Sequence, residues 1–211
     1  MRENIKTVAV LIAIGFIIVA MAPEFRNHQE DAIQEELTYT GDGILDSKKD
    51  SAASVKAFAS VYKVLMSPRC MNCHPSGDVP LQGDDSHLHT MLPRRGKDGK
   101  GLYAMKCGNC HQPTNTAGLN TPPGNPNWHL PPGDMKMVFQ GKTAHELAKQ
   151  IVDPKLNGHK SMEKLLEHVS DTLVLWGWNP GEERTKPPLP YEEFKKAWTT
   201  WIETGAYAPK K

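Results

Sequence analysis

All four cysteines of this 211-residue chain lie in two copies of the same five-residue pattern. The pattern is Cys-x-x-Cys-His, and its members are Cys70, Cys73 and His74 in the first copy and Cys107, Cys110 and His111 in the second. No cysteine remains to form a disulfide with another part of the chain. The fold must therefore present two short segments that each carry two thiols and one imidazole.

The spacing within each copy has a mechanical reason. Two thiols three positions apart on a helical turn can reach the two vinyl groups of one haem, and the histidine that follows can bind the iron. The sequence therefore predicts two covalently attached haem c groups. The predicted attachment residues are Cys70, Cys73, Cys107 and Cys110, and the predicted proximal iron ligands are His74 and His111.

Paired cysteines have two other common uses in proteins. A zinc or iron–sulfur site built from four thiolates explains the cysteines, but it does not explain a histidine directly after both pairs. A thioredoxin-like redox pair is expected inside a βαβ pattern, and neither copy lies in one. Haem attachment explains all six residues.

The N-terminus indicates export. Arg2 and Lys6 precede an apolar run over residues 8–22, as in a secretory signal. Pro23 disfavours cleavage after residue 22, whereas the run is shorter than the roughly 20 residues that span a bilayer comfortably. Residues 1–22 are thus predicted to be a signal peptide or a membrane anchor. Both alternatives predict a periplasmic protein, either soluble or tethered to the inner membrane.

The rest of the chain divides into a polar, acidic linker over residues 23–50 and a dihaem cytochrome c domain over residues 51–211. The predicted fold class is mostly α and loop-rich, with the two haems as core, because only 38% of residues are hydrophobic and the chain has 17 Gly and 17 Pro. No alternating strand pattern appears. Apolar spacing and capping residues predict helices over 55–66, around 102–105, and over 143–152, 161–169 and 191–204.

Each haem iron needs either a sixth ligand or an open site, and this decides between an electron carrier and an enzyme. His129 is the first choice, because Pro131 and Pro132 stiffen its loop, and His89 is the second. The alternatives are His87, His168, Met135 and Met137.

Several stretches resemble known cytochromes. Residues 101–111 resemble the haem-attachment helix of soluble c-type cytochromes, which implies that Tyr103 packs near a haem edge. Residues 80–87, 126–132, 165–169 and 173–178 resemble a dihaem family labelled "isoquinoline 1-oxidoreductase subunit", a small cytochrome partner of periplasmic molybdenum hydroxylases. This resemblance implies electron transfer, with redox proteins as partners and a molybdenum hydroxylase among them.

The expected function is therefore a relay of electrons between a partner oxidoreductase and a respiratory acceptor. The alternative is a haem enzyme, peroxidase-like or acting on another small molecule, with one haem open to substrate. A net charge of +1 gives no reason to expect nucleic acid as a partner. No residue is assigned a catalytic role.

Overall fold

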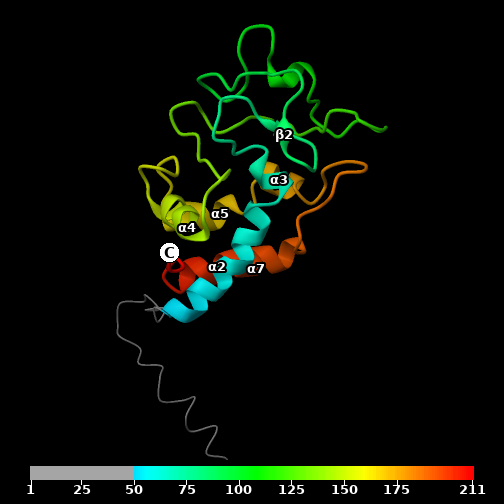
Figure 1. Cartoon of the computed structure of the whole chain (residues 1–211). Coiled ribbons are helices and arrows are strands. Elements are labelled where there is room, and N and C mark those ends of the chain that lie inside the picture. Colours follow the sequence, from blue (N-terminus) through cyan, green and yellow to red (C-terminus); the bar gives the residue numbers. More distant parts are fainter. Residues whose placement is uncertain (1–49) are drawn as a thin grey trace, which may run out of the picture. The chain divides into compact units, whose positions relative to one another are not determined.

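Helices α2 (Ser51–Leu65) and α7 (Tyr191–Glu203) make the most extensive packing in the described chain (Figure 1). The computed structural model describes residues 50–211. The predicted signal or anchor at 1–22, and the linker at 23–50 apart from its last residue, lie outside the described residues. Among residues 50–211, no helix is both long and apolar enough to cross a membrane.

Helix α2 begins where the sequence offers a cap. The Asp50 carboxylate accepts hydrogen bonds from the amides of Ala52 and Ala53, at 3.0 and 2.9 Å. These bonds satisfy two donors that have no partner within the helix. The buried side chains Phe58, Val61, Val64 and Leu65 then recur three and four residues apart, which gives α2 one apolar face.

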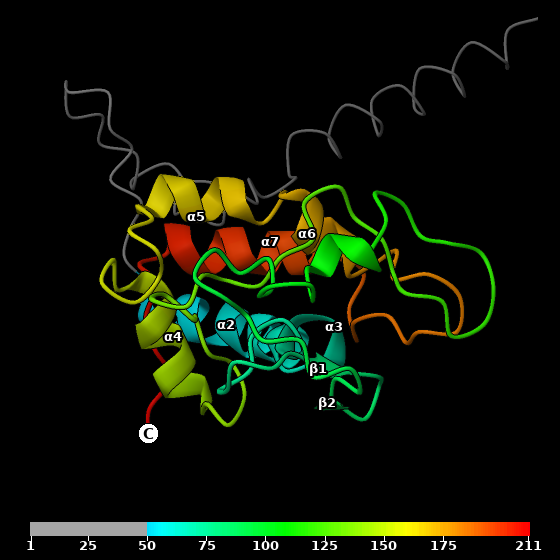
Figure 2. The same ribbon diagram turned by 90° about the horizontal axis from the view of Figure 1, so that it is seen from above.

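The protein core lies between four helices. Helix α7 lies between α2 and α5 (Met162–His168) in Figure 2, and α4 (Ala144–Val152) also contacts α2. The Trp201 ring packs on Phe58 at 4.6 Å between ring centres, and the Trp198 indole donates to the Leu165 carbonyl at 2.8 Å. Large aromatic side chains thus fill the core and also satisfy their polar atoms.

Two predicted helix starts are confirmed in atomic detail. Thr143 and Glu146 form a capping box at the start of α4, with each side chain bonded to the other residue's amide. Ser161 caps α5 by accepting from the amide of Lys164 at 3.3 Å. Helix α6 (Thr172–Trp176) was not predicted, because five residues are too few to show a helical period.

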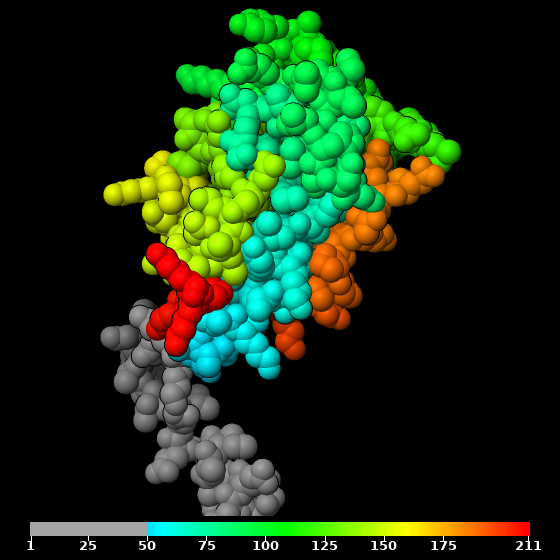
Figure 3. Space-filling view, viewed as in Figure 1, coloured from blue at the N-terminus to red at the C-terminus, as the bar shows by residue number. Residues whose placement is uncertain are grey.

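The chain around the two cysteine motifs is mostly irregular. The first motif begins in the short helix α3 (Pro68–Met71), and the second begins in the 3₁₀ helix η1 (Cys107–Asn109). Strands β1 (Leu81–Gln82) and β2 (His87–Leu88) pair antiparallel between them, with Leu81 opposite Leu88. These segments occupy the upper part of the face in Figure 3.

The helix predicted around residues 102–105 is wrong. Residues 102–104 form turns, and Tyr103 has a φ of +50°, which a helix does not tolerate. Its side chain is 89% exposed. Tyr103 does not line the cavity described below, and its contact with a haem edge, implied by the resemblance, stays a prediction.

Candidate functional site

The first cysteine motif is held on consecutive helical turns. Pro68 is at the first turn of α3, where its missing amide hydrogen costs nothing. The Cys73 amide then donates to the Cys70 carbonyl at 3.2 Å, and the His74 amide donates to that of Met71 at 2.9 Å. The turn therefore continues through the whole motif and brings the two sulfurs and the imidazole into a fixed order.

The His74 ring is fixed from two directions. Its Nδ1 lies 2.7 Å from the Met137 carbonyl oxygen, and the ring stacks on Phe139 at 3.8 Å between centres with 7° between the planes. A carbonyl can only accept, so Nδ1 carries the proton and Nε2 keeps its lone pair. Burial lowers the pKa of His74 to about 4, which keeps the ring neutral.

The second motif repeats this arrangement with different residues. The His111 amide donates to the Cys107 carbonyl at 2.9 Å. Nδ1 of His111 lies 2.7 Å from the Pro123 carbonyl oxygen, and the ring stacks on Trp128 at 4.1 Å with 11° between the planes. Burial lowers the pKa of His111 as well. Both motifs thus end in a neutral imidazole whose Nε2 is free to bind a metal.

Asn72 and Asn109 occupy the same position in the two motifs and make similar hydrogen bonds. Asn72 donates from its side-chain amide to the Gly83 carbonyl at 2.8 Å, and Asn109 donates to the Ala104 carbonyl at 2.7 Å. Each asparagine therefore ties its motif to a neighbouring loop. The sequence shows that both motifs read Cys-x-Asn-Cys-His, but it does not show which carbonyls the asparagines bind.

A cavity of about 710 Å³ lies between the two motifs. Its wall includes Cys73 from the first motif and Cys107, Cys110 and His111 from the second. The side chains of Met91, Met105, Trp128 and Trp176 also line it. None of the buried members of the helical core lines it. The cavity is therefore a separate, largely apolar space that the loops enclose.

The cavity brings together three of the predicted distal histidines, namely His87, His89 and His129. The His89 ring centre is 6.4 Å from that of His111, with 71° between the planes. His129 Nδ1 lies 2.5 Å from the Asn127 carbonyl oxygen, which leaves its Nε2 with a lone pair. His87 Nδ1 lies 2.6 Å from an Asp85 carboxylate oxygen, near the surface.

The other predicted ligands lie elsewhere. His168 is the last residue of α5, and its Nδ1 is 2.5 Å from an Asp171 carboxylate oxygen. After burial and the Met137 hydrogen bond, the charge of His168 also acts on the pKa of His74, so the two are neighbours. Met137 supplies the carbonyl that holds His74, and its sulfur is 3.6 Å from Gln150 Nε2. Met135 does not line the cavity.

Two buried arginines near the motifs were missed by sequence reasoning. Arg69, within α3, donates to the Gly83 carbonyl and to the Asp84 carboxylate. Arg95 is 1% exposed and donates to the carbonyls of Pro131, Gly77 and Pro75, at 2.7, 3.1 and 3.5 Å. Their partners are mostly backbone oxygens far away in the sequence, and no residue pattern announces such partners.

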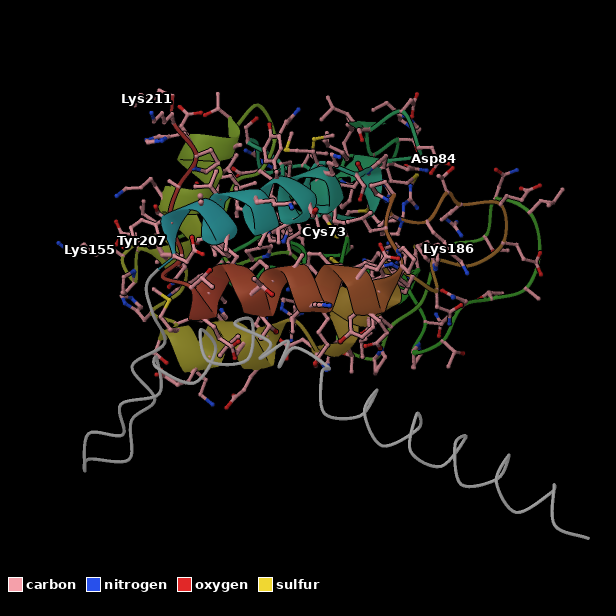
Figure 4. The ribbon with its side chains drawn as sticks, turned by 90° about the horizontal axis from the view of Figure 1, so that it is seen from below. Cys73, Asp84, Lys155, Lys186, Tyr207 and Lys211 are labelled. Atoms are coloured by element: carbon pink, nitrogen blue, oxygen red, sulfur yellow. The ribbon has the colours of Figure 1, made fainter. Side chains whose placement is uncertain are left out.

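Asp84 lies in the turn between β1 and β2, and its carboxylate has partners on both sides. One carboxylate oxygen is 2.5 Å from Arg69, and the other accepts from the amide and the hydroxyl of Thr185 at 3.0 and 2.6 Å. Figure 4 shows Asp84 and Lys186 at the same end of the molecule. Asp84 therefore joins the first motif to a loop about a hundred residues later.

The thiols of the first cysteine pair resist deprotonation in the folded chain. Burial raises the pKa of the Cys70 thiol to about 12 and that of Cys73 to about 11. Burial also raises the pKa of Cys107. Within residues 50–211, no group of three or more His, Cys, Asp or Glu is arranged to hold a metal ion by itself. A haem iron takes four of its ligands from the porphyrin, so this finding does not bear on haem binding.

Comparisons with protein-family models, with curated proteins and with solved structures give no significant match.

Proposed function

We propose that this protein is a dihaem c-type cytochrome that carries electrons in the periplasm. The proposal rests on the contacts that the rings of His74 and His111 make. In both motifs Nδ1 is bound to a backbone carbonyl at 2.7 Å and the ring is stacked on an aromatic side chain. Metal-ligating histidines almost always donate their second ring N–H in this way, because the contact sets the tautomer and the ring orientation.

The residues present also fit a haem. A volume of about 710 Å³ is within the range of roughly 300–1,000 Å³ that cofactor-sized ligands occupy. Cys107, Cys110 and His111 line the same wall, so attachment and ligation can occur from one side. The apolar side chains of Met91, Met105 and Trp128 suit the face of a flat, mostly apolar ring. The haem would supply an iron that cycles between Fe(III) and Fe(II).

The neighbouring residues would hold the two sites close together. Cys73 and Cys107 line one cavity although they belong to different motifs. Burial raises the pKa of Cys73, Arg69 lowers it, and Cys107 raises it further, so Cys107 lies near Cys73. Two haems attached at these sulfurs would therefore have neighbouring edges, which favours transfer of an electron from one to the other. The proposed partners are an oxidoreductase that donates electrons, for which a molybdenum hydroxylase is one candidate, and a respiratory acceptor.

The experiment is to produce the full chain together with a cytochrome c maturation system. We expect its mass to exceed that of the polypeptide by two haems, with a Soret band that survives acid and organic extraction. Cys70→Ala combined with Cys73→Ala should remove one haem, and Cys107→Ala combined with Cys110→Ala should remove the other. A chain with the mass of its amino acids and no Soret band would refute the proposal.

The coordination state of the two irons distinguishes an electron carrier from the alternative, a haem enzyme. A carrier keeps both irons closed, whereas a peroxidase-like haem enzyme leaves one iron accessible. We expect the reduced protein to bind no carbon monoxide. Stoichiometric binding of carbon monoxide at one haem would favour the enzyme instead.

A further inference from the structure

The position of His89 relative to His111 carries an inference beyond the two attachment motifs. Their ring centres are 6.4 Å apart and the planes are inclined at 71°. A metal–imidazole bond is about 2 Å long and a ring nitrogen lies about 1 Å from its ring centre, so two imidazoles on opposite sides of one metal have centres about 6 Å apart. We propose that His89 is the axial ligand opposite His111 on the iron of the second haem. This inference rests on the proposed function.

The environment of His111 leaves one nitrogen for the iron. Nδ1 is occupied by the Pro123 carbonyl, and Trp128 covers one face of the ring. His89 approaches His111 at a steep angle and does not stack on it. Two imidazoles that bind one iron can be twisted about their common axis, so an angle of 71° between the planes is compatible with a shared metal.

The backbone around His89 is fixed on both sides. The His89 amide donates to the Pro80 carbonyl at 3.0 Å, and the His89 carbonyl accepts from the Leu92 amide at 2.8 Å. The amide and hydroxyl of Thr90 donate to the Gln82 side chain at 3.1 and 3.2 Å. His89 thus follows a short hairpin whose end is tied down, which is what a metal ligand on a loop requires.

The surroundings of the His89 ring set its charge and its tautomer. Burial and then the charge of His87 lower the pKa of His89, which favours the neutral form of the ring. The Met91 amide donates to His89 Nδ1 at 3.3 Å, so in this arrangement Nε2 carries the proton. Ligation through Nε2 puts the proton on Nδ1 and gives up this long contact, which lies at the weak end of hydrogen-bond distances.

The two other histidines of the cavity wall serve as competitors in the test. The His87 side chain is 45% exposed and pairs with Asp85 at the surface. His129 has the correct tautomer for ligation through Nε2, but among the described residues it has no ring contact with His111. Since the ring-centre distance singles out His89, we expect His89→Ala alone to open the second iron.

The test uses the full chain with both haems attached and compares His89→Ala, His87→Ala and His129→Ala with the unaltered protein. The readouts are haem content by mass, spin state by electron paramagnetic resonance, and carbon monoxide bound per reduced protein. We expect His89→Ala to turn one haem high-spin and to raise carbon monoxide binding from none to one equivalent. Added imidazole should restore the low-spin signal. His87→Ala and His129→Ala should leave spin state and binding unchanged.

A second variant decides the matter if His89→Ala fails to retain its haem. His89→Met should keep both haems low-spin, add the near-infrared band of a methionine thioether ligand and raise the reduction potential of one haem. Unchanged spin state in His89→Ala with both haems attached, an unchanged potential in His89→Met, or an opening of the iron by His129→Ala would each overturn the assignment. Absence of covalent haem from the unaltered chain would instead refute the proposed function.

Discussion

Asp84 is a single side chain that joins the first cysteine motif to a distant loop. It pairs with Arg69, whose side chain is 3% exposed, and accepts two hydrogen bonds from Thr185. Burial opposes ionisation of Asp84, but the Thr185 bonds and the charges of Arg69 and Arg184 hold its pKa below the usual value. Removing the charge leaves a buried guanidinium without its anion.

We expect Asp84→Asn to lower the free energy of unfolding by about 1–2 kcal/mol at pH 7, because the exposed side of the carboxylate is screened by solvent. The pKa is lower in the folded state, so this contribution is present above the unfolded pKa of about 3.9 and is lost as pH falls through the folded pKa. Urea unfolding at pH 7 and pH 3 measures both effects.

Asp85→Asn is the matched control for this pair. Its side chain is 74% exposed and contacts His87 only near the surface. We expect a change within about 0.5 kcal/mol. Equal losses for both variants would contradict the assigned role of Asp84.

At the scale of elements, α4 depends on its first turn. The Thr143 hydroxyl accepts from the Glu146 amide at 3.2 Å, and the Glu146 carboxylate accepts from the Thr143 amide at 2.9 Å. Behind this box, Leu147, Ala148 and Ile151 are buried in the core. The cap therefore fixes where an apolar helix face begins.

We expect Thr143→Ala to lower the free energy of unfolding by about 1–2 kcal/mol, since the Glu146 amide loses its acceptor and the Glu146 carboxylate loses the Thr143 hydroxyl. Lys149→Ala, at an exposed position of the same helix, should change it by less than about 0.5 kcal/mol. Thermal unfolding followed by circular dichroism compares the two. If Lys149→Ala lowered the free energy of unfolding as much as Thr143→Ala, the capping box would not be the source of the stability of α4.

Elements with a local signal were predictable from the sequence, and elements held by distant backbone were not. The starts of α4 and α5 follow from Thr143, Glu146 and Ser161, whose capping bonds span three residues. The pairing of β1 with β2 was missed because two-residue strands have no period. A left-handed residue at Tyr103 overrode a short helical pattern.

The same contrast holds for the site. The Cys-x-x-Cys-His motifs are visible as residue types, but the acceptors of His74 and His111 are backbone carbonyls of Met137 and Pro123. Every residue has such a carbonyl, so its role depends on the path of the chain alone. The sequence ranked His129 above His89 from the neighbouring prolines, whereas the short distance between the His89 and His111 rings depends on the path of the chain.

At the scale of the whole molecule, Arg95 ties together segments that flank the two motifs. Its guanidinium bonds to the carbonyls of Pro75 and Gly77 on one side and of Pro131 on the other. A buried cation with three backbone acceptors holds its neighbours strongly, because no water can replace it. The loops around the cavity are thus crosslinked through one side chain.

We expect Arg95→Met to lower the free energy of unfolding by roughly 2–5 kcal/mol, because three backbone carbonyls lose the charged donor that a buried side chain supplies. Arg94→Met is the control, since that side chain is 69% exposed and lies 3.8 Å from Asp78. Chemical denaturation measures the difference. Similar stabilities for the two variants would contradict the crosslinking role of Arg95.

The separation of the helical core from the cavity predicts uneven dependence on the cofactor. The buried side chains of α2, α4, α5 and α7 pack on one another and do not line the cavity. In the chain with all four cysteines changed to alanine, we expect amides of α2 and α7 to stay protected in hydrogen exchange. Amides of residues 76–135 should exchange faster than in the haem-bound protein. Equal loss of protection in both parts would show that the core itself depends on haem.

The carbonyl contacts of the two motif histidines are nested along the chain. The acceptor of His111 is the Pro123 carbonyl, 12 residues later in the chain. The acceptor of His74 is the Met137 carbonyl, 63 residues later and beyond the second motif. In a chain that leaves the membrane N-terminus first, the first motif would emerge before the second. The carbonyl acceptor of the second motif histidine would nevertheless emerge before that of the first. If the chain is exported and receives haem as proposed, we expect the second site to be completed before the first.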